Sequence, residues 1–347
     1  MHKSMALFLG LLIFSFIVTS TFIVPFISLL YKYRLTRRRQ LTKDFQDKPT
    51  PIFDKFHKHK VGTPVGGGFL VVCVVSLLFA CLFPLGKYLG VFVTHVYPIA
   101  DEINIIFFTF LSFALLGLYD DIMKFFNFSK TGFFGLRMRH KLIIQWILGF
   151  IISLLLYQNL KIDIFYIPFI GVFNLSWVYI PVTAFIIVSF ANAVNITDGL
   201  DGLASGVLMI CLFAFWLLSA SILDTPLSFF IALWLGSLTA FLYFNIYPAR
   251  IWLGDVGSLS FGATLAVVGL LLGKVMALVV IGGIFTVEIL SSLIQLLSKK
   301  FRKKKAFPVA PLHLWLQLKG WEEPKIIMRA WLAAIMLAIF GVWLAVI

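Results

Sequence analysis

The carboxylates that could do chemistry stand in short gaps between long apolar runs. Asp120 and Asp121 are adjacent, Asp198 and Asp201 lie in a second gap, and Asp255 lies in a third. If the apolar runs cross a membrane alternately, all five carboxylates open onto the same face. Mg²⁺ prefers one or two carboxylates together with substrate phosphates. The pattern therefore favours a membrane enzyme that handles a charged, phosphorylated substrate.

The segment from Asn192 to Gly202 is the densest polar stretch between two apolar runs. Asn192 and Asn195 are three residues apart, as are Asp198 and Asp201. In a helix this spacing places each pair on one face. Because polar residues at membrane depth usually mark function rather than packing, the four side chains are candidate ligands of a substrate.

Positive charge accompanies the first acidic pair. Lys124 stands three residues after Asp121, and Lys141 opens the next apolar run. This cationic setting suits phosphate, so the two carboxylates are candidates for a Mg²⁺ site or a general base, and a solvated helix end is the alternative. Asp255 precedes another run, where a helix N-terminus attracts anions and a carboxylate can hold a bridging cation. A simple N-cap would also explain it.

A glycine-rich segment ends the first basic gap. It reads Lys58-His59-Lys60-Val61-Gly62-Thr63-Pro64-Val65-Gly66-Gly67-Gly68. Glycine lets backbone N–H groups approach an anion closely, and the lysines add positive charge. It is not a Walker A loop, because no Gly-Lys-Ser/Thr follows. A flexible turn that enters a helix explains the glycines equally well.

The composition is that of a membrane protein, with 61% hydrophobic and 13% charged residues. A soluble domain carries about 25% charged residues, and runs of about 20 apolar residues are typical of membrane helices. We expect an all-α polytopic protein in which residues 1–347 form a single transmembrane domain. About ten spans are predicted, near 5–31, 68–90, 103–119, 141–158, 177–191, 203–222, 227–244, 257–273, 275–298 and 330–347.

The basic residues predict the topology. Of the 29 Lys and Arg residues, 25 fall in alternate gaps, so that side should be cytoplasmic and both termini should lie outside. The net charge of +14 is also typical of proteins that bind nucleic acid, but membrane topology and attraction to anionic lipids explain this charge better. The three cysteines lie inside apolar runs, and no His or Cys spacing typical of zinc is present.

Taken in order, these motifs resemble those of the polyprenyl-phosphate N-acetylhexosamine-1-phosphate transferases, a family of ten-helix membrane enzymes. The resemblance runs from about Gly62 to Lys325 and rests on three motifs: Asp120-Asp121, Asn192 to Gly202, and Gly254-Asp255-Val256-Gly257-Ser258. Three further stretches are most similar to the subfamily that transfers phospho-MurNAc-pentapeptide: Gly62-Thr63-Pro64, Asn195 to Gly202, and Leu318-Lys319-Gly320-Trp321 with Glu323-Pro324-Lys325.

The resemblance implies that undecaprenyl phosphate attacks UDP-MurNAc-pentapeptide, giving lipid I and UMP for peptidoglycan synthesis. It implies an active site on the cytoplasmic face of a bacterial inner membrane, and a homodimer. It also implies Mg²⁺ held by Asp255, with Asp120 and Asp121 as the other catalytic residues. The implied substrate-binding residues are Lys58, Thr63, Lys124, Lys141, Asn192, Asn195, Asp198, Asp201, Asn245 and His313.

One departure from the family pattern leaves alternatives open. The subfamily typically has three consecutive histidines after Pro-Leu, whereas here only His313 is present, followed by Leu314 and Trp315. A transferase for UDP-GlcNAc or a related donor, in O-antigen or teichoic acid synthesis, is the nearest alternative. A secondary transporter is more distant, because it predicts ionisable residues at mid-membrane and only Glu288 lies deep in a run. Glu288 is either a proton site of such a transporter or a carboxylate satisfied within the bundle.

Overall fold

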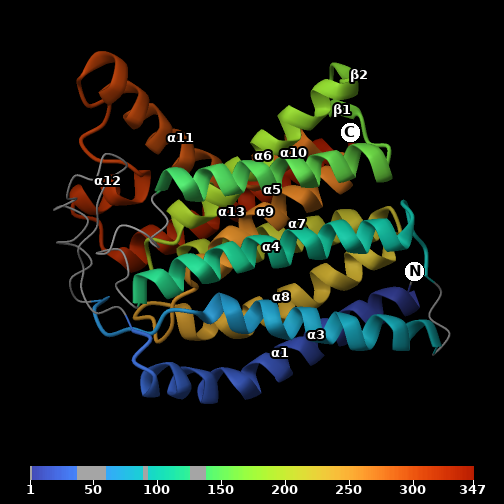
Figure 1. Cartoon of the computed structure of the whole chain (residues 1–347), viewed down its shortest axis with the longest axis horizontal. Coiled ribbons are helices and arrows are strands. Elements are labelled where there is room, and N and C mark those ends of the chain that lie inside the picture. Colours follow the sequence, from blue (N-terminus) through green and yellow to red (C-terminus); the bar gives the residue numbers. More distant parts are fainter. Residues whose placement is uncertain (1, 37–59, 89–92, 126–137) are drawn as a thin grey trace.

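A computed structural model of the chain describes residues 2–36, 60–88, 93–125 and 138–347 (Figure 1). Within these ranges nine helices are long and apolar enough to cross a membrane, and a bent pair would make a tenth. The all-α polytopic fold is therefore confirmed. The main helices are α1 (His2–Lys32), α3 (Gly67–Tyr88), α4 (Ile99–Phe125), α5 (Met138–Asn159), α6 (Tyr179–Thr197), α7 (Leu203–Ser221), α8 (Thr225–Asn245), α9 (Gly254–Leu271), α10 (Val275–Ile281), α11 (Gly283–Leu297), α12 (Leu312–Leu318) and α13 (Glu323–Val346).

Several helices continue beyond the apolar runs that predict them. α4 extends to Phe125, so Asp120 and Asp121 lie on its last turns instead of in a loop. α6 extends to Thr197 and therefore includes Asn192 and Asn195. Hydropathy marks where side chains stop being apolar, whereas the backbone hydrogen bonds of a helix continue through polar residues. The candidate residues are thus placed by rigid helix ends.

The predicted span at 275–298 is wrong as a single helix. α10 and α11 meet at Gly282 with a bend of 82°. Consecutive small residues are a common cause of sharp kinks, and Gly282 is followed by Gly283. A side chain at Gly282 would also collide with Phe190, whose ring lies 2.7 Å from the position of an added Cβ. In Figure 1 α11 leaves the bundle and is followed by a short π-helix, η4 (Ser298–Arg302).

A two-stranded hairpin was not predicted. β1 (Ile164–Ile167) pairs antiparallel with β2 (Gly171–Asn174), and the 3₁₀ turn η3 (Ser176–Val178) leads from it into α6. The hairpin and both chain termini lie at one end of the bundle, and α12 lies at the other (Figure 1). The shared end of the two termini agrees with the predicted even number of crossings.

α9 forms the centre of the bundle. All its residues except Asp255 are buried, and it packs against α3, α4 and α6. An aromatic cluster fills the space beside it and ties α4, α8 and α9 together through Phe107, Phe110, Phe230, Trp234 and Phe261. The first turn of α9, which carries Asp255, is therefore held rigidly at one end of the bundle.

Candidate active site

Close helix packing brings the two acidic motifs together. A Cβ added at Gly117 of α4 would lie only 2.2 Å from the carbonyl oxygen of Asp255, so the two backbones touch there. One turn further along α4, Asp121 accepts a hydrogen bond from the Val256 N–H at 3.2 Å. Because the first N–H groups of a helix lack partners within the helix, this carboxylate satisfies the start of α9. Asp121 therefore fixes the helix that carries Asp255.

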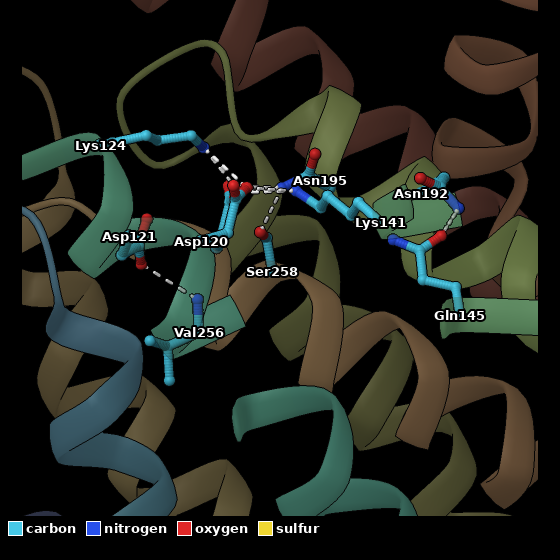
Figure 2. A network of polar contacts seen from close by, with 10 residues as sticks. Asp120, Asp121, Lys124, Lys141, Gln145, Asn192, Asn195, Val256 and Ser258 are labelled. Carbon is cyan, nitrogen blue, oxygen red and sulfur yellow. Dashed lines mark hydrogen bonds and ion pairs between the residues drawn. The ribbon is translucent and has the colours of Figure 1, made fainter. Parts of the chain in front are cut away.

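Two lysines and two aspartates form a four-charge cluster. The Lys124 Nζ lies 3.1 Å from Asp120 Oδ2 and 2.7 Å from Asp255 Oδ2, and the Lys141 Nζ lies 2.9 Å and 2.6 Å from the same two atoms. Figure 2 shows both lysines reaching toward Asp120 from opposite sides. The Lys124 side chain is 58% exposed, whereas that of Lys141 is 14% exposed. One cation of the cluster is therefore open to solvent.

Asn195 joins α6 to this cluster. Its Nδ2 donates to Asp255 Oδ1 at 2.9 Å and to the Ser258 Oγ at 2.7 Å. The two oxygens of Asp255 thus have different partners: one faces the lysines and the other faces Asn195. This arrangement confirms that α4, α5, α6 and α9 contribute predicted residues to one cluster, and it orients the carboxylate of Asp255.

Asn192 lies beside the cluster and contacts a residue that the sequence analysis missed. Its Nδ2 donates to Gln145 Oε1 at 2.6 Å and to the Val188 carbonyl at 2.8 Å (Figure 2). Gln145 is fully buried, and its Nε2 has no hydrogen-bond partner among the described residues. It stands four residues after Lys141, on the same face of α5. A polar residue at that spacing, inside an otherwise apolar run, could have identified Gln145 from the sequence.

Asp201 lies in a second, buried ion cluster and not in the first. Lys60 is 4% exposed, and its Nζ lies 2.8 Å from Asp201 Oδ1 and 2.5 Å from Glu323 Oε1. The Asp201 N–H donates to the same Glu323 oxygen at 2.7 Å, and the Ala249 N–H donates to Asp201 Oδ2 at 2.9 Å. The contacts of Lys60 with Asp201 and Glu323 could not be predicted from the sequence, because the three residues are far apart in the chain.

Asn245 supports the chain around it. Its Oδ1 accepts from the Gly202 N–H at 3.1 Å and from the Ser205 Oγ at 2.5 Å, and its Nδ2 donates to the Ile251 carbonyl at 2.9 Å. The residue is 2% exposed. Since the protein already occupies its polar groups, Asn245 joins two segments that flank the site.

The glycine-rich segment packs against α9 and presents no anion site at Gly66, Gly67 or Gly68. The N–H groups of these residues donate to the carbonyls of Trp252 and Leu253 at 2.8–3.1 Å. The turn that enters a helix is therefore the correct interpretation of these three glycines. Thr63 is half-buried nearby, and Lys58 lies outside the described residues.

Asp198 precedes Gly199 in the chain, and His313 packs against Gly199. A Cβ added at Gly199 would lie 2.6 Å from His313 Nε2, so the imidazole abuts this short segment. Asp198 follows α6 and is half-buried. Burial raises the pKa of its carboxyl well above the usual range, and the negative charges of Asp255 and Asp201 raise it further. His313 Nδ1 contacts Glu288 Oε2 at 3.1 Å, so Glu288 is satisfied within the bundle.

The four-charge cluster can bind phosphates and a divalent cation. Its ammonium groups match phosphate oxygens, and Asp120 and Asp255 supply carboxylate oxygens. The described part of the chain contains no group of three or more His, Cys, Asp and Glu side chains that could hold a metal alone. A metal at this end of the bundle would therefore need ligands from a substrate, which is the usual situation for Mg²⁺.

Comparisons with known proteins agree with this chemistry. The model of glycosyl transferase family 4 matches residues 103–273. A phospho-N-acetylmuramoyl-pentapeptide transferase of Caldanaerobacter subterraneus is 35% identical over 281 residues, which cover 81% of this chain and 84% of that protein. The enzyme of the same name from Bacillus subtilis is 33% identical over 294 residues, covering 84% and 86%. The chain therefore belongs to the phospho-N-acetylmuramoyl-pentapeptide transferases, within glycosyl transferase family 4.

Proposed function

We propose that this protein transfers phospho-MurNAc-pentapeptide from UDP-MurNAc-pentapeptide to undecaprenyl phosphate, forming lipid I and releasing UMP. An oxygen of the lipid phosphate attacks the phosphorus next to the sugar. A new P–O–P bond forms while the P–O bond to UMP breaks with its electron pair, so one diphosphate bond replaces another. The observation that carries the proposal is the four-charge cluster, in a chain that matches such transferases over more than four fifths of its length.

Lys124 and Lys141 receive the phosphates. The reaction brings the lipid phosphate close to the diphosphate of the donor, and cations must offset their repulsion. Each ammonium group already contacts two carboxylate oxygens, which phosphate oxygens can replace. Lys124 is the more exposed of the two, so it is the first cation that an incoming phosphate meets.

Asp120 positions the two lysines. Its Oδ2 contacts both ammonium groups and so fixes their separation. The attack itself needs no strong base, because the second pKa of a phosphate monoester is near 6 and the group is largely ionised at neutral pH. Asp121 supports the same geometry indirectly, by holding the first turn of α9.

Asp120 and Asp255 also fit Mg²⁺. Both carboxylates contact the same two ammonium groups, so their oxygens converge on one positively charged centre. Asp255 is the preferred protein ligand because Asn195 holds its other oxygen and fixes its orientation. When bound, Mg²⁺ would neutralise charge on the donor diphosphate and its leaving group.

The donor nucleotide and sugar occupy the side of the site that Asp198 and His313 line. Along α6 and the residue that follows it, Asn195, which contacts the four-charge cluster, lies between Asn192 and Asp198. His313 Nε2 is buried and has no hydrogen-bond partner among the described residues. A hydroxyl or N–H group of the donor would supply that missing partner.

The active site faces the cytoplasm of a bacterial inner membrane in this proposal. The alternate gaps of the sequence that carry the site's carboxylates also contain 25 of the 29 Lys and Arg residues, and positive charge favours the cytoplasmic side. The cytoplasm is also where a water-soluble nucleotide sugar is available. The homodimer remains a prediction.

A radiolabelled transfer assay tests the proposal. Purified protein, undecaprenyl phosphate and Mg²⁺ are offered labelled UDP-MurNAc-pentapeptide or UDP-GlcNAc, with Asp255→Asn beside the wild type. Asp163→Asn, at the opposite end of the bundle, is the matched control. We expect lipid product from the first donor in the wild type and the control, and none in Asp255→Asn. Absence of product from the wild type with either donor would refute the proposal.

The alternative donor rests on one observation, the presence of His313 without the two histidines that usually follow it. Leu314 is buried, and Trp315 packs against Phe307 with the ring centroids 5.9 Å apart, so neither reproduces an imidazole. If only UDP-GlcNAc gave a product, the fold and the type of reaction would stand, but the enzyme would belong to another pathway.

A further inference from the structure

A buried carboxylate holds the lone histidine of the donor side. Glu288 on α11 is 4% exposed and His313 on α12 is 1% exposed. Glu288 Oε1 accepts the backbone N–H of His313 at 3.1 Å, and Oε2 contacts the ring Nδ1 at 3.1 Å. One carboxylate therefore contacts both the backbone and the ring of the same residue, and it restrains the position and the rotation of the imidazole.

The contact with Glu288 selects one tautomer. An ionised carboxylate only accepts hydrogen bonds, so the proton of a neutral imidazole must reside on Nδ1. Nε2 then carries a lone pair and acts as an acceptor. Nε2 is buried and has no hydrogen-bond partner in the described part of the chain. A buried polar atom without a partner is costly, and a ligand that donates a hydrogen bond would remove this cost.

The free nitrogen faces the loop that follows α6. Only 2.6 Å separates Nε2 from the position of a Cβ at Gly199, so a glycine is required for the ring to approach this segment. Asp198 is the preceding residue. The bend between α10 and α11 contributes to the geometry, since it turns α11 so that Glu288 meets α12.

We infer that Glu288 is a positioning residue that presents His313 Nε2 as a hydrogen-bond acceptor to a hydroxyl or amide N–H group of the sugar nucleotide. The inference rests on the proposed function, because it concerns the donor side of the same site. It also gives the single histidine a specific role. With Leu314 and Trp315 in the next two positions, no second imidazole is available there to replace it.

Steady-state kinetics with each substrate varied in turn test the inference. The variants are Glu288→Ala, Glu288→Gln, His313→Ala and the double variant Glu288→Ala/His313→Ala, with Glu322→Gln as an exposed control carboxylate. Loss of this hydrogen bond frees the imidazole to rotate, so we expect Glu288→Ala to raise the donor KM on the order of 10-fold and to leave the KM for undecaprenyl phosphate unchanged. Glu288→Gln should lose less, because its amide oxygen still accepts from Nδ1.

The double variant separates positioning from a purely structural role. If Glu288 acts through His313, its removal costs nothing further once the imidazole is absent, so Glu288→Ala/His313→Ala should equal His313→Ala. The inference would be overturned if the loss in the double variant equalled the product of the two single losses. An equal rise in the KM for both substrates would also overturn it.

A measurement without turnover keeps this test distinct from that of the proposed function. Long-range ¹H–¹⁵N spectra of histidine-labelled protein report which ring nitrogen carries the proton, and His313→Ala identifies the signal. We expect a protonated Nδ1 and a bare Nε2 in the wild type, and a mixture of tautomers in Glu288→Ala. The reverse tautomer in the wild type would refute the positioning role even if the transfer reaction is confirmed.

Discussion

Replacing Lys60 by Met should destabilise the protein without removing its chemistry. Met has a similar length and no charge, so the change leaves the carboxylates of Asp201 and Glu323 buried beside each other. Loss of one partner from a buried ion cluster typically costs about 3–5 kcal/mol. At about 2 °C for each kcal/mol in a large domain, Tm should fall by roughly 6–10 °C.

Thermal unfolding in one detergent, followed by loss of the monodisperse peak after heating, measures this effect. Glu323→Gln alone should cost less than Lys60→Met, because a balanced pair of Lys60 and Asp201 remains. In the Lys60→Met background, Glu323→Gln should recover part of the loss, since it removes one uncompensated buried charge. Glu322→Gln is the control, because this neighbouring carboxylate is exposed.

Two results would refute this reasoning. A Tm of Lys60→Met within 2 °C of the wild type, about 1 kcal/mol by the same conversion, would mean that water reaches the cluster and solvates the two carboxylates. A loss of transfer activity at a temperature where the variant remains folded would mean that Lys60 contacts a substrate. In that case Asp201 would return to the substrate-binding residues that the sequence predicts.

Three further variants test other parts of the structure. Lys141→Gln should lower kcat/KM about 100-fold or more in the transfer assay, as expected for the loss of a preorganised charge, when activity is measured at a temperature where the variant remains folded. Gly199→Ala should raise the donor KM, because its Cβ would meet His313 Nε2 at 2.6 Å, whereas Gly10→Ala meets nothing within 4 Å and should have no effect. Asp224→Asn should raise Tm at pH 7 but not at pH 4. Burial raises the pKa of Asp224, so the wild type loses stability as pH rises from the ordinary value of an aspartate toward the raised one, whereas Asn keeps the cap on the Leu227 N–H.

Part of the four-charge cluster could have been predicted from the sequence. Asp120 and Lys124 are four residues apart and share a face where a helix continues through both, but the predicted span ended at residue 119, and α4 continues to Phe125. Lys141 opens the next span at the same end of the bundle. Asp255 required only the assumption that successive spans alternate in direction, which places the start of α9 beside the end of α4.

Distant pairing accounts for what the sequence did not predict. Asp201 resembles Asp198 in its surroundings, since each is followed by a glycine. Its partners Lys60 and Glu323 lie 141 and 122 residues away, and no periodicity links them. The resemblance likewise implied Asn245 as a substrate-binding residue, but its partners are Gly202, Ser205 and Ile251, which tertiary folding brings together. The break at Gly282 had a local signal, the Gly282-Gly283 pair, within a run whose hydropathy alone predicts a straight span.

The two ion clusters differ in a way that decides which one can do chemistry. In the cluster of Lys60, Asp201 and Glu323 the ammonium group is buried against two carboxylates, so a phosphate would have to displace a buried anion to reach it. In the cluster of Lys124 and Lys141, one cation is 58% exposed and the charges are balanced two against two. A phosphate can enter there by exchanging one anion for another around the same cations, which avoids leaving any charge unpaired. Accessibility combined with charge balance, more than the number of carboxylates, is therefore the reason that we propose phosphoryl transfer at the four-charge cluster and a structural role for the cluster of Lys60, Asp201 and Glu323.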